Sequence, residues 1–114
     1  MATVDDLRRI AMSLDGTTEA PHFDRSAFKV RRIYATLAAD GLTANLKLDP
    51  GEQTMACELQ PRAFAKVRNA WGDQGWTTVT LARIGETDLR DALALAWRHA
   101  TAKPRAVAKP RRSK

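Results

Sequence analysis

Between Ser26 and Leu48 the apolar side chains recur at every second residue, which is the period of a β-strand with one buried face. The pattern is interrupted at Arg31-Arg32 and again at Asp40-Gly41. Asp-Gly is among the strongest short hairpin signals, because both residues tolerate the positive φ angles of a tight turn. We therefore predict three antiparallel strands with one face on a core and the other in water. The alternating apolar residues are Phe28, Val30, Ile33, Ala35, Leu37, Leu42, Ala44, Leu46 and Leu48.

Helical spacing replaces this pattern on both sides of the three strands. Thr3 and Asp6 have the spacing of a capping box, and the amphipathic helix that follows is expected to end at Gly16. Near the other end, a stripe of apolar residues from Leu89 to Ala100 predicts a helix that is capped by Thr87 and continues to about Ala102.

The remaining segments are shorter. Asp49-Pro50-Gly51 ends the meander and begins a short helix over 52–59, and residues 76–81 predict a final strand. Residues 17–25, which include Pro21, and residues 72–75 are predicted to be loops. Residues 64–67 fit either a short strand or an irregular segment.

These elements predict an α+β two-layer sandwich, in which the N- and C-terminal helices pack on one face of an antiparallel sheet of four to five strands. This domain is expected to span residues 1–102.

Residues 103–114 differ from the rest of the chain in charge. They contain six Lys or Arg and no Asp or Glu, so the other 13 basic residues balance all 13 acidic ones within residues 1–102. With two prolines and one Val, the segment has too little apolar surface to offset the entropy of ordering, and we predict a disordered basic tail. Such tails commonly contact nucleic acid, and the alternative is a solubilising terminus.

Composition excludes several other classes. The longest apolar run, residues 92–97, is far shorter than the roughly 18 residues of a membrane span, and the charged N-terminus does not resemble a signal peptide. Cys57 is the single cysteine, so an intrachain disulfide is impossible, and we expect it to be a half-buried structural residue. A soluble, cytoplasmic protein is expected.

Four segments together resemble the MmcQ/YjbR family of small bacterial proteins. They are the helix exit from Leu14 to Glu19, the strand pair from Ser26 to Leu37, Asn45-Leu-Lys-Leu48, and Gly75-Trp-Thr-Thr-Val-Thr-Leu81. The likeness covers almost all of residues 1–102. It implies a frataxin-like (CyaY-like) α+β fold and DNA binding, and it brings no catalytic residues. This chain departs from the family at Arg31, where the first hairpin usually has a glycine.

A cluster of cations around the first hairpin is the main candidate site, because Lys and Arg contact phosphates. The alternative is that Lys29 and Arg32 pair with Asp24 or Asp40 on an ordinary surface. Trp71 flanks a glycine-rich turn and could stack on a base, although Trp71 and Trp76 could equally anchor the core. The candidate nucleic-acid-binding residues are Arg25, Lys29, Arg31, Arg32, Arg68, Trp71 and Arg83, with Lys103, Arg105, Lys109, Arg111, Arg112 and Lys114 of the tail.

An enzyme has little support in the sequence. His22 and His99 have no metal-ligand spacing, and no nucleophile motif is present. His22, with Asp24 two residues away, is the better candidate for a general base, and the alternative is a loop histidine with local hydrogen bonds.

The leading hypothesis is therefore a monomeric, non-enzymatic DNA-binding protein of low sequence specificity, with no cofactor and no metal. The alternative is an adaptor that binds a small ligand or protein in a groove near Trp71, Trp76 and His22, with a tail that only aids solubility.

Overall fold

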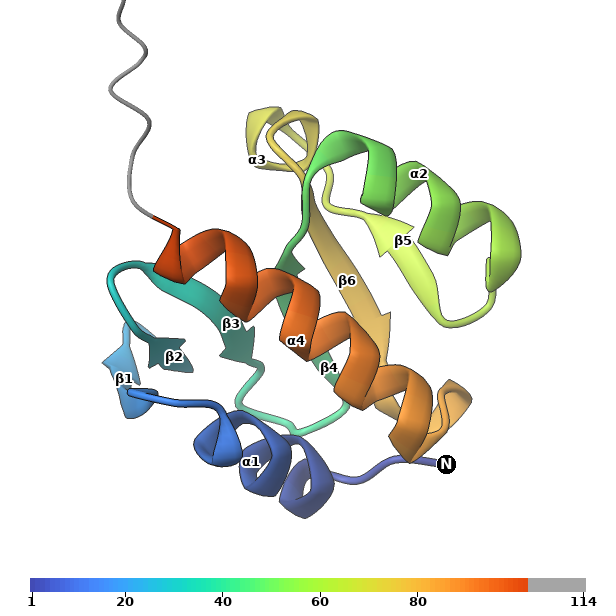
Figure 1. Cartoon of the computed structure of the whole chain (residues 1–114). Helices are drawn as coiled ribbons and strands as arrows, with labels where there is room; N and C mark the ends of the chain where they lie inside the picture. Colours follow the sequence, from blue (N-terminus) through green and yellow to red (C-terminus); the bar gives the residue numbers. More distant parts are fainter. Residues whose placement is uncertain (103–114) are drawn as a thin grey trace, which may run out of the picture.

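The computed structural model describes residues 1–102, and the predicted basic tail lies outside them. The chain forms four α-helices and six β-strands, in the order α1-β1-β2-β3-β4-α2-β5-α3-β6-α4 (Figure 1). The helices are α1 (Val4–Ser13), α2 (Pro50–Leu59), α3 (Ala70–Asp73) and α4 (Glu86–Thr101), and a 3-10 turn covers Leu81–Arg83. The strands are β1 (Thr18–His22), β2 (Arg25–Lys29), β3 (Ile33–Leu37), β4 (Thr43–Lys47), β5 (Phe64–Lys66) and β6 (Trp76–Thr80).

All six strands form one antiparallel sheet in the order β1-β2-β3-β4-β6-β5. The α+β class is confirmed, but the sheet has six strands instead of four to five. The additional strand is β1, which the sequence analysis wrongly interpreted as a loop because of Pro21. Pro21 is tolerated because β1 is an edge strand, where a missing N–H leaves no ladder partner unsatisfied.

Two smaller predictions need correction, and one open choice is settled. Residues 64–66 form the edge strand β5, which settles the choice left open for this segment. The predicted loop at 72–75 begins inside the short helix α3. Helix α4 begins at Glu86 with Gly85 in the N-cap position, so Thr87 lies within the first turn and does not cap the helix.

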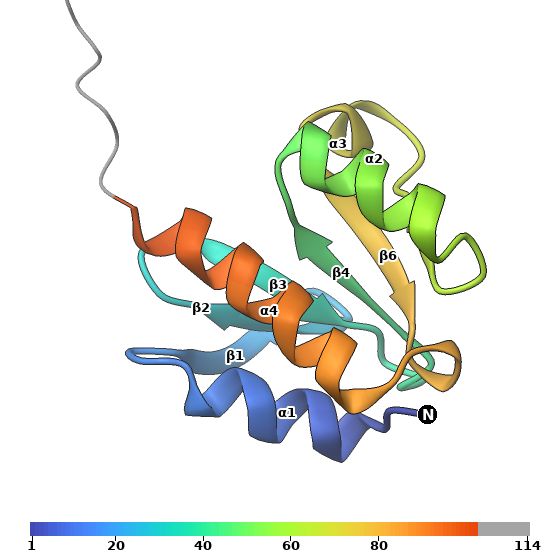
Figure 2. The same cartoon turned by 45° about the vertical axis from the view of Figure 1, so that its right-hand side comes forward.

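Helices α1 and α4 lie side by side on one face of the sheet, and α2 packs beside β5 (Figures 1 and 2). The core between the two layers includes side chains that are at most 2% exposed. Among them are Leu7 and Ile10 of α1, Leu89 and Leu93 of α4, Phe28, Leu46 and Val79 of the sheet, and Leu48 directly after β4. The capping box predicted at Thr3 and Asp6 is confirmed and fixes the start of α1.

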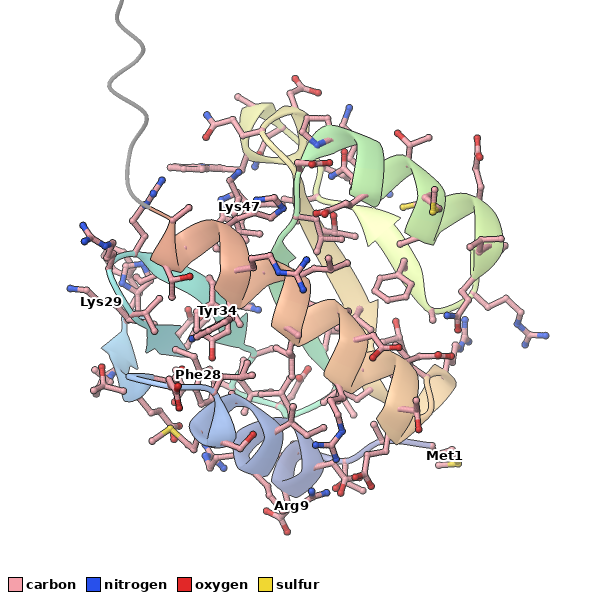
Figure 3. The ribbon with its side chains drawn as sticks, in the orientation of Figure 1. Met1, Arg9, Phe28, Lys29, Tyr34 and Lys47 are labelled. Atoms are coloured by element: carbon pink, nitrogen blue, oxygen red, sulfur yellow. The ribbon has the colours of Figure 1, made fainter. Side chains whose placement is uncertain are left out.

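Strand β3 contains an irregularity that directs two neighbouring side chains toward the helices. The register between β2 and β3 shifts at Phe28/Lys29, and Tyr34 and Ala35 are both fully buried (Figure 3). The Tyr34 hydroxyl lies 2.9 Å from Thr17 Oγ1 and donates a hydrogen bond to the Ala11 carbonyl oxygen at 3.3 Å. Burial raises the pKa of Tyr34, and the hydrogen bond to Thr17 offsets part of that rise.

Replacing Tyr34 with Phe removes both hydrogen bonds, so we expect the free energy of unfolding at neutral pH to fall by about 1 kcal/mol. Because folding raises the Tyr34 pKa, the native protein also loses stability as the pH rises above about 10, the unfolded value. Tyr34→Phe should weaken this alkaline loss. Urea unfolding at neutral and alkaline pH measures both effects, and tyrosinate absorbance reports Tyr34 alone because it is the single tyrosine. The same alkaline loss in both proteins would contradict the assignment.

Candidate functional site

The face of the sheet opposite α1 and α4 is not covered by any helix of the described chain, and it lies behind the strands in Figure 1. Side chains along a strand alternate between the two faces. In β4 and β6 every second residue is buried on the helix side, and the residues that alternate with them point to the open face. These are Thr43, Asn45 and Lys47 of β4 and Trp76, Thr78 and Thr80 of β6. A hydrogen bond from the Thr78 hydroxyl to Asn45 Oδ1 at 2.8 Å joins the two strands there.

The charged strand residues of the open face are all cations. Arg25 and Lys29 of β2 and Lys47 of β4 lie on it, and the other strand residues of this face are Ala, Thr, Ile, Asn, Trp and His. Within residues 1–102, the single strand carboxylate, Glu19, points to the helix side, where Arg8 binds it through both oxygens. Among the described residues, none of the three cations forms an ion pair.

A groove of about 620 Å³ crosses this face diagonally. One wall is the turn between β1 and β2, residues 22–25, and the other is the connection between β5 and β6, with Val67, Asn69 and Trp71. The floor is formed by Ile33, Thr36, Asn45 and Trp76. The groove thus contains Trp71, Trp76 and His22, the three residues that the sequence analysis named for a ligand groove.

The β1–β2 wall presents a phenylalanine to solvent. Only Phe23 and Asp24 separate the paired residues His22 and Arg25, so the turn is a two-residue hairpin loop. Phe23 has a φ of 58°, which such turns require but which is costly for a residue other than Gly or Asn. Its side chain is 93% exposed and contacts the His22 ring edge-on, with the ring centroids 4.8 Å apart. An apolar ring in a strained turn, outside the core, is a feature that folding alone does not explain.

The opposite wall is built around Asn69, whose φ of 97° and ψ of −174° lie in a region otherwise used by glycine. Asn69 Oδ1 accepts a hydrogen bond from the Trp71 backbone N–H at 2.9 Å. The adjacent Gly72 packs its backbone against the Val67 carbonyl, where a Cβ would collide. These contacts fix the backbone of Trp71, whose side chain remains 59% exposed.

A buried amide holds this wall to the domain. Gln53 of α2 is 5% exposed, and its Nε2 donates to the carbonyl oxygens of Gly72 at 3.0 Å and Trp76 at 2.9 Å. Gln53 Nε2 also lies 3.2 Å from Thr77 Oγ1. The Thr77 hydroxyl in turn donates to the Gly75 carbonyl oxygen at 2.9 Å. The turn between Trp71 and Trp76 is therefore anchored to α2 by hydrogen bonds, although the sequence analysis named neither Gln53 nor Thr77.

The predicted cations do not all come together. Arg25 lies in the groove wall, where its Nε donates to Thr36 Oγ1 at 2.8 Å. Lys29 and Arg31 are exposed at the β2–β3 turn, and neither Lys29 nor Arg32 pairs with Asp24 or Asp40.

Arg32 instead connects the β2–β3 turn to the end of α4, since its Nη2 donates to the Ala102 carbonyl oxygen at 3.0 Å. Figure 1 shows this turn beside the end of α4. The last described residue therefore lies beside the basic turn. The candidate residues Lys103, Arg105, Lys109, Arg111, Arg112 and Lys114 follow it in the sequence, outside the described part.

Arg68 and Arg83 are separated from one another. Arg68 is exposed, and its sequence neighbours Val67 and Asn69 line the groove. Arg83 follows the far end of β6, where its Nη1 lies 3.5 Å from the Arg62 carbonyl oxygen. Of these two candidates, only Arg68 is adjacent in the sequence to residues that line the groove.

The two histidines have different surroundings. His22 is exposed, and among the described contacts it makes no hydrogen bond with Asp24. His99 Nε2, on α4, lies 2.8 Å from Glu52 Oε1 and 3.9 Å from Asp49 Oδ2. Asp49 and Glu52 form the capping box that begins α2. Sequence spacing gave no sign of this cluster, because His99 is 47 residues from Glu52. Its polar contacts connect the C-terminal half of α4 to the start of α2.

Replacing Gln53 with Met removes the buried donor while keeping the side-chain length. We expect the free energy of unfolding to fall by about 2 kcal/mol, because the Gly72 and Trp76 carbonyls lose their partner in the interior. Chemical denaturation measures this loss, and Trp emission should move to longer wavelength as the turn loosens. Gln60→Met, at an exposed amide, is the matched control and should cost less than about 0.5 kcal/mol. Equal effects would exclude the anchoring role.

Comparison with known proteins gives the family. The family model described as YjbR matches residues 12–99. The crystal structure of the Deinococcus radiodurans protein DR2400, with the family-model domain DUF419, is similar to this chain at 29% sequence identity and a TM-score of 0.77. The alignment covers 90% of this chain and 81% of that one. No curated protein matches. The resemblance noted from the strand and turn segments is thereby confirmed, and the chain belongs to the YjbR family.

Proposed function

We propose that this protein is a non-enzymatic DNA-binding protein of low sequence specificity, and that the open face of the sheet receives the phosphate backbone. The observation that carries the proposal is the cationic character of this face, where Arg25, Lys29 and Lys47 have no carboxylate partner in the described chain. Lys and Arg side chains that are free of intramolecular ion pairs can release counterions from DNA on binding.

The cations of the helix layer, in contrast, are mostly held in ion pairs, which strengthens this interpretation. Most cations of α1 and α4 are already paired: Arg8 with Glu19 at 2.8 Å, Arg9 with Asp6 at 2.9 Å and Arg90 with Glu86 at 2.9 Å. The carboxylates of these two helices are Asp5, Asp6, Glu86, Asp88 and Asp91. Residues 1–102 therefore have no net charge, but the strand residues of the sheet face carry cations alone, whereas α1 and α4 hold five carboxylates against four Arg.

The basic segment 103–114 follows Ala102, the last residue that the structure describes. The Ala102 carbonyl oxygen accepts a hydrogen bond from Arg32 at the β2–β3 turn. Lys29 and Arg31 lie next to Arg32 on the same hairpin. We propose that the six cations of this segment add long-range attraction to the same anion that the sheet face contacts.

A second candidate function is the adaptor or small-ligand module. The groove with Trp71, Trp76 and His22 favours it, since a concave site with apolar walls and few polar groups suits a small molecule. In that case the segment 103–114 would have no role in binding.

Replacing both Lys29 and Lys47 with Gln should weaken DNA binding and lower the slope of log affinity against log salt concentration by about 2, or ~0.9 for each phosphate contact. Fluorescence anisotropy with labelled DNA over a salt series measures both quantities. The matched control is Arg9→Gln with Arg90→Gln, which removes the same charge from the helix layer. Equal losses in the two double variants would show that net charge matters and the sheet face does not.

A chain ending at Ala102 lacks the six terminal cations, so its salt slope should be lower by about 5 if all of them contact phosphates. The same titration applied to the full and shortened chains measures this difference. An unchanged slope and affinity would remove residues 103–114 from the binding mechanism and would favour the adaptor.

A further inference from the structure

We infer that the groove on the open face binds unpaired bases, so that single-stranded DNA is the preferred form of the ligand. This inference rests on the proposed DNA-binding function and adds to it which part of the nucleic acid enters the groove. It stands on three features: exposed rings on opposite walls of the groove, free amide donors on its floor and one wall, and cations in one wall and on a strand beside the floor.

The rings are placed for contact with a ligand instead of with the core. Phe23 on one wall is 93% exposed and Trp71 on the other is 59% exposed, while Trp76 forms part of the floor. The turns carrying Phe23 and Trp71 contain the two non-glycine residues with positive φ in the described chain, Phe23 itself and Asn69. Strained backbone that presents apolar rings to solvent is typical of a ligand clamp. Flat apolar rings on a sheet surface are a common platform for base stacking.

The polar groups of the groove suit the edge of a base. Asn45 Oδ1 accepts a hydrogen bond from the Thr78 hydroxyl, and Asn69 Oδ1 accepts one from the Trp71 N–H. Both amide oxygens are therefore occupied, and neither Nδ2 group has an acceptor among the described residues. Free amide donors can bind the carbonyl oxygens and ring nitrogens of bases. Asp24, the carboxylate in the groove wall, can accept from a base amino group.

The charge around the groove favours a nucleotide over an apolar peptide. Arg25 lies in one wall, Lys47 pairs directly with Trp76 on the neighbouring strand, and Arg68 lies in sequence between the lining residues Val67 and Asn69. Phosphates on either side of a stacked base would lie near these cations. A duplex has its base faces stacked inside, so it can reach the cations but cannot fill the space between the rings without base flipping.

The test compares DNA strands with the full chain. A single-stranded oligonucleotide of about ten bases, near the middle of the usual site sizes, and a duplex of the same length are titrated at equal salt, with Trp fluorescence and anisotropy as readouts. The single strand should bind more tightly and should quench Trp emission. Phe23→Ala and Trp71→Ala should each weaken single-strand binding by about 5- to 150-fold, as expected for loss of one stacked base, while duplex affinity stays unchanged.

Two controls separate stacking from other effects. Leu59→Ala removes an apolar side chain that is 74% exposed on α2, outside the groove, and should leave single-strand affinity unchanged. Trp71→Tyr keeps a stacking ring and should retain most of the affinity. Because Phe23 and Trp71 are exposed, their alanine variants should unfold at the same denaturant concentration as the natural chain.

The possible failures can be told apart. If neither DNA form binds, the proposed function falls together with this inference. If both forms bind and the two alanine variants bind single strands normally, the inference is overturned while DNA binding stands. A mononucleotide that binds as tightly as the oligonucleotide would assign the groove to a small ligand. An RNA strand that binds more tightly than DNA of the same sequence would overturn the assignment to DNA.

Discussion

One-sided burial is the constraint on which the rest of this structure depends. Leu89 and Leu93 of α4, together with α1, cover a single face of a six-stranded sheet, and the apolar residues of β4 and β6 alternate so that only that face needs cover. The other face is left free of any requirement for packing. It can therefore hold cations, amides and aromatic rings that a core would not tolerate.

The part of the fold with strong local signals could be predicted from the sequence. The capping box at Thr3, the Asp40-Gly41 turn and the alternation through Leu48 gave the helix, the meander and the class, and the family resemblance gave the same fold class independently. Strand β1 escaped prediction because Pro21 and its polar neighbours show no period, and an edge strand exposed on both faces needs none. The register shift beside Tyr34 also has no local signal, since it arises from pairing with β2.

The candidate site was predictable in composition but not in shape. Residue type and position were enough to name Trp71, Trp76 and the cations around the β2–β3 hairpin. The groove itself depends on the crossover that places β6 between β4 and β5, which brings Asn69 and Trp71 opposite the turn at Phe23. Phe23 was missed because it lies in a segment interpreted as a loop. Gln53 was missed because an amide inside a short polar helix gives no sign of the carbonyls that it will meet.

Pro21 has a further consequence for how this sheet can meet other molecules. An edge strand normally offers a row of N–H and C=O groups on which another chain can add as a seventh strand, and proline removes one of those donors. At the other border, β5 spans only three residues and is flanked by α2. Both borders are thus poor templates for strand addition and for polymerisation. Recognition is thereby directed away from the margins of the sheet and onto its exposed surface.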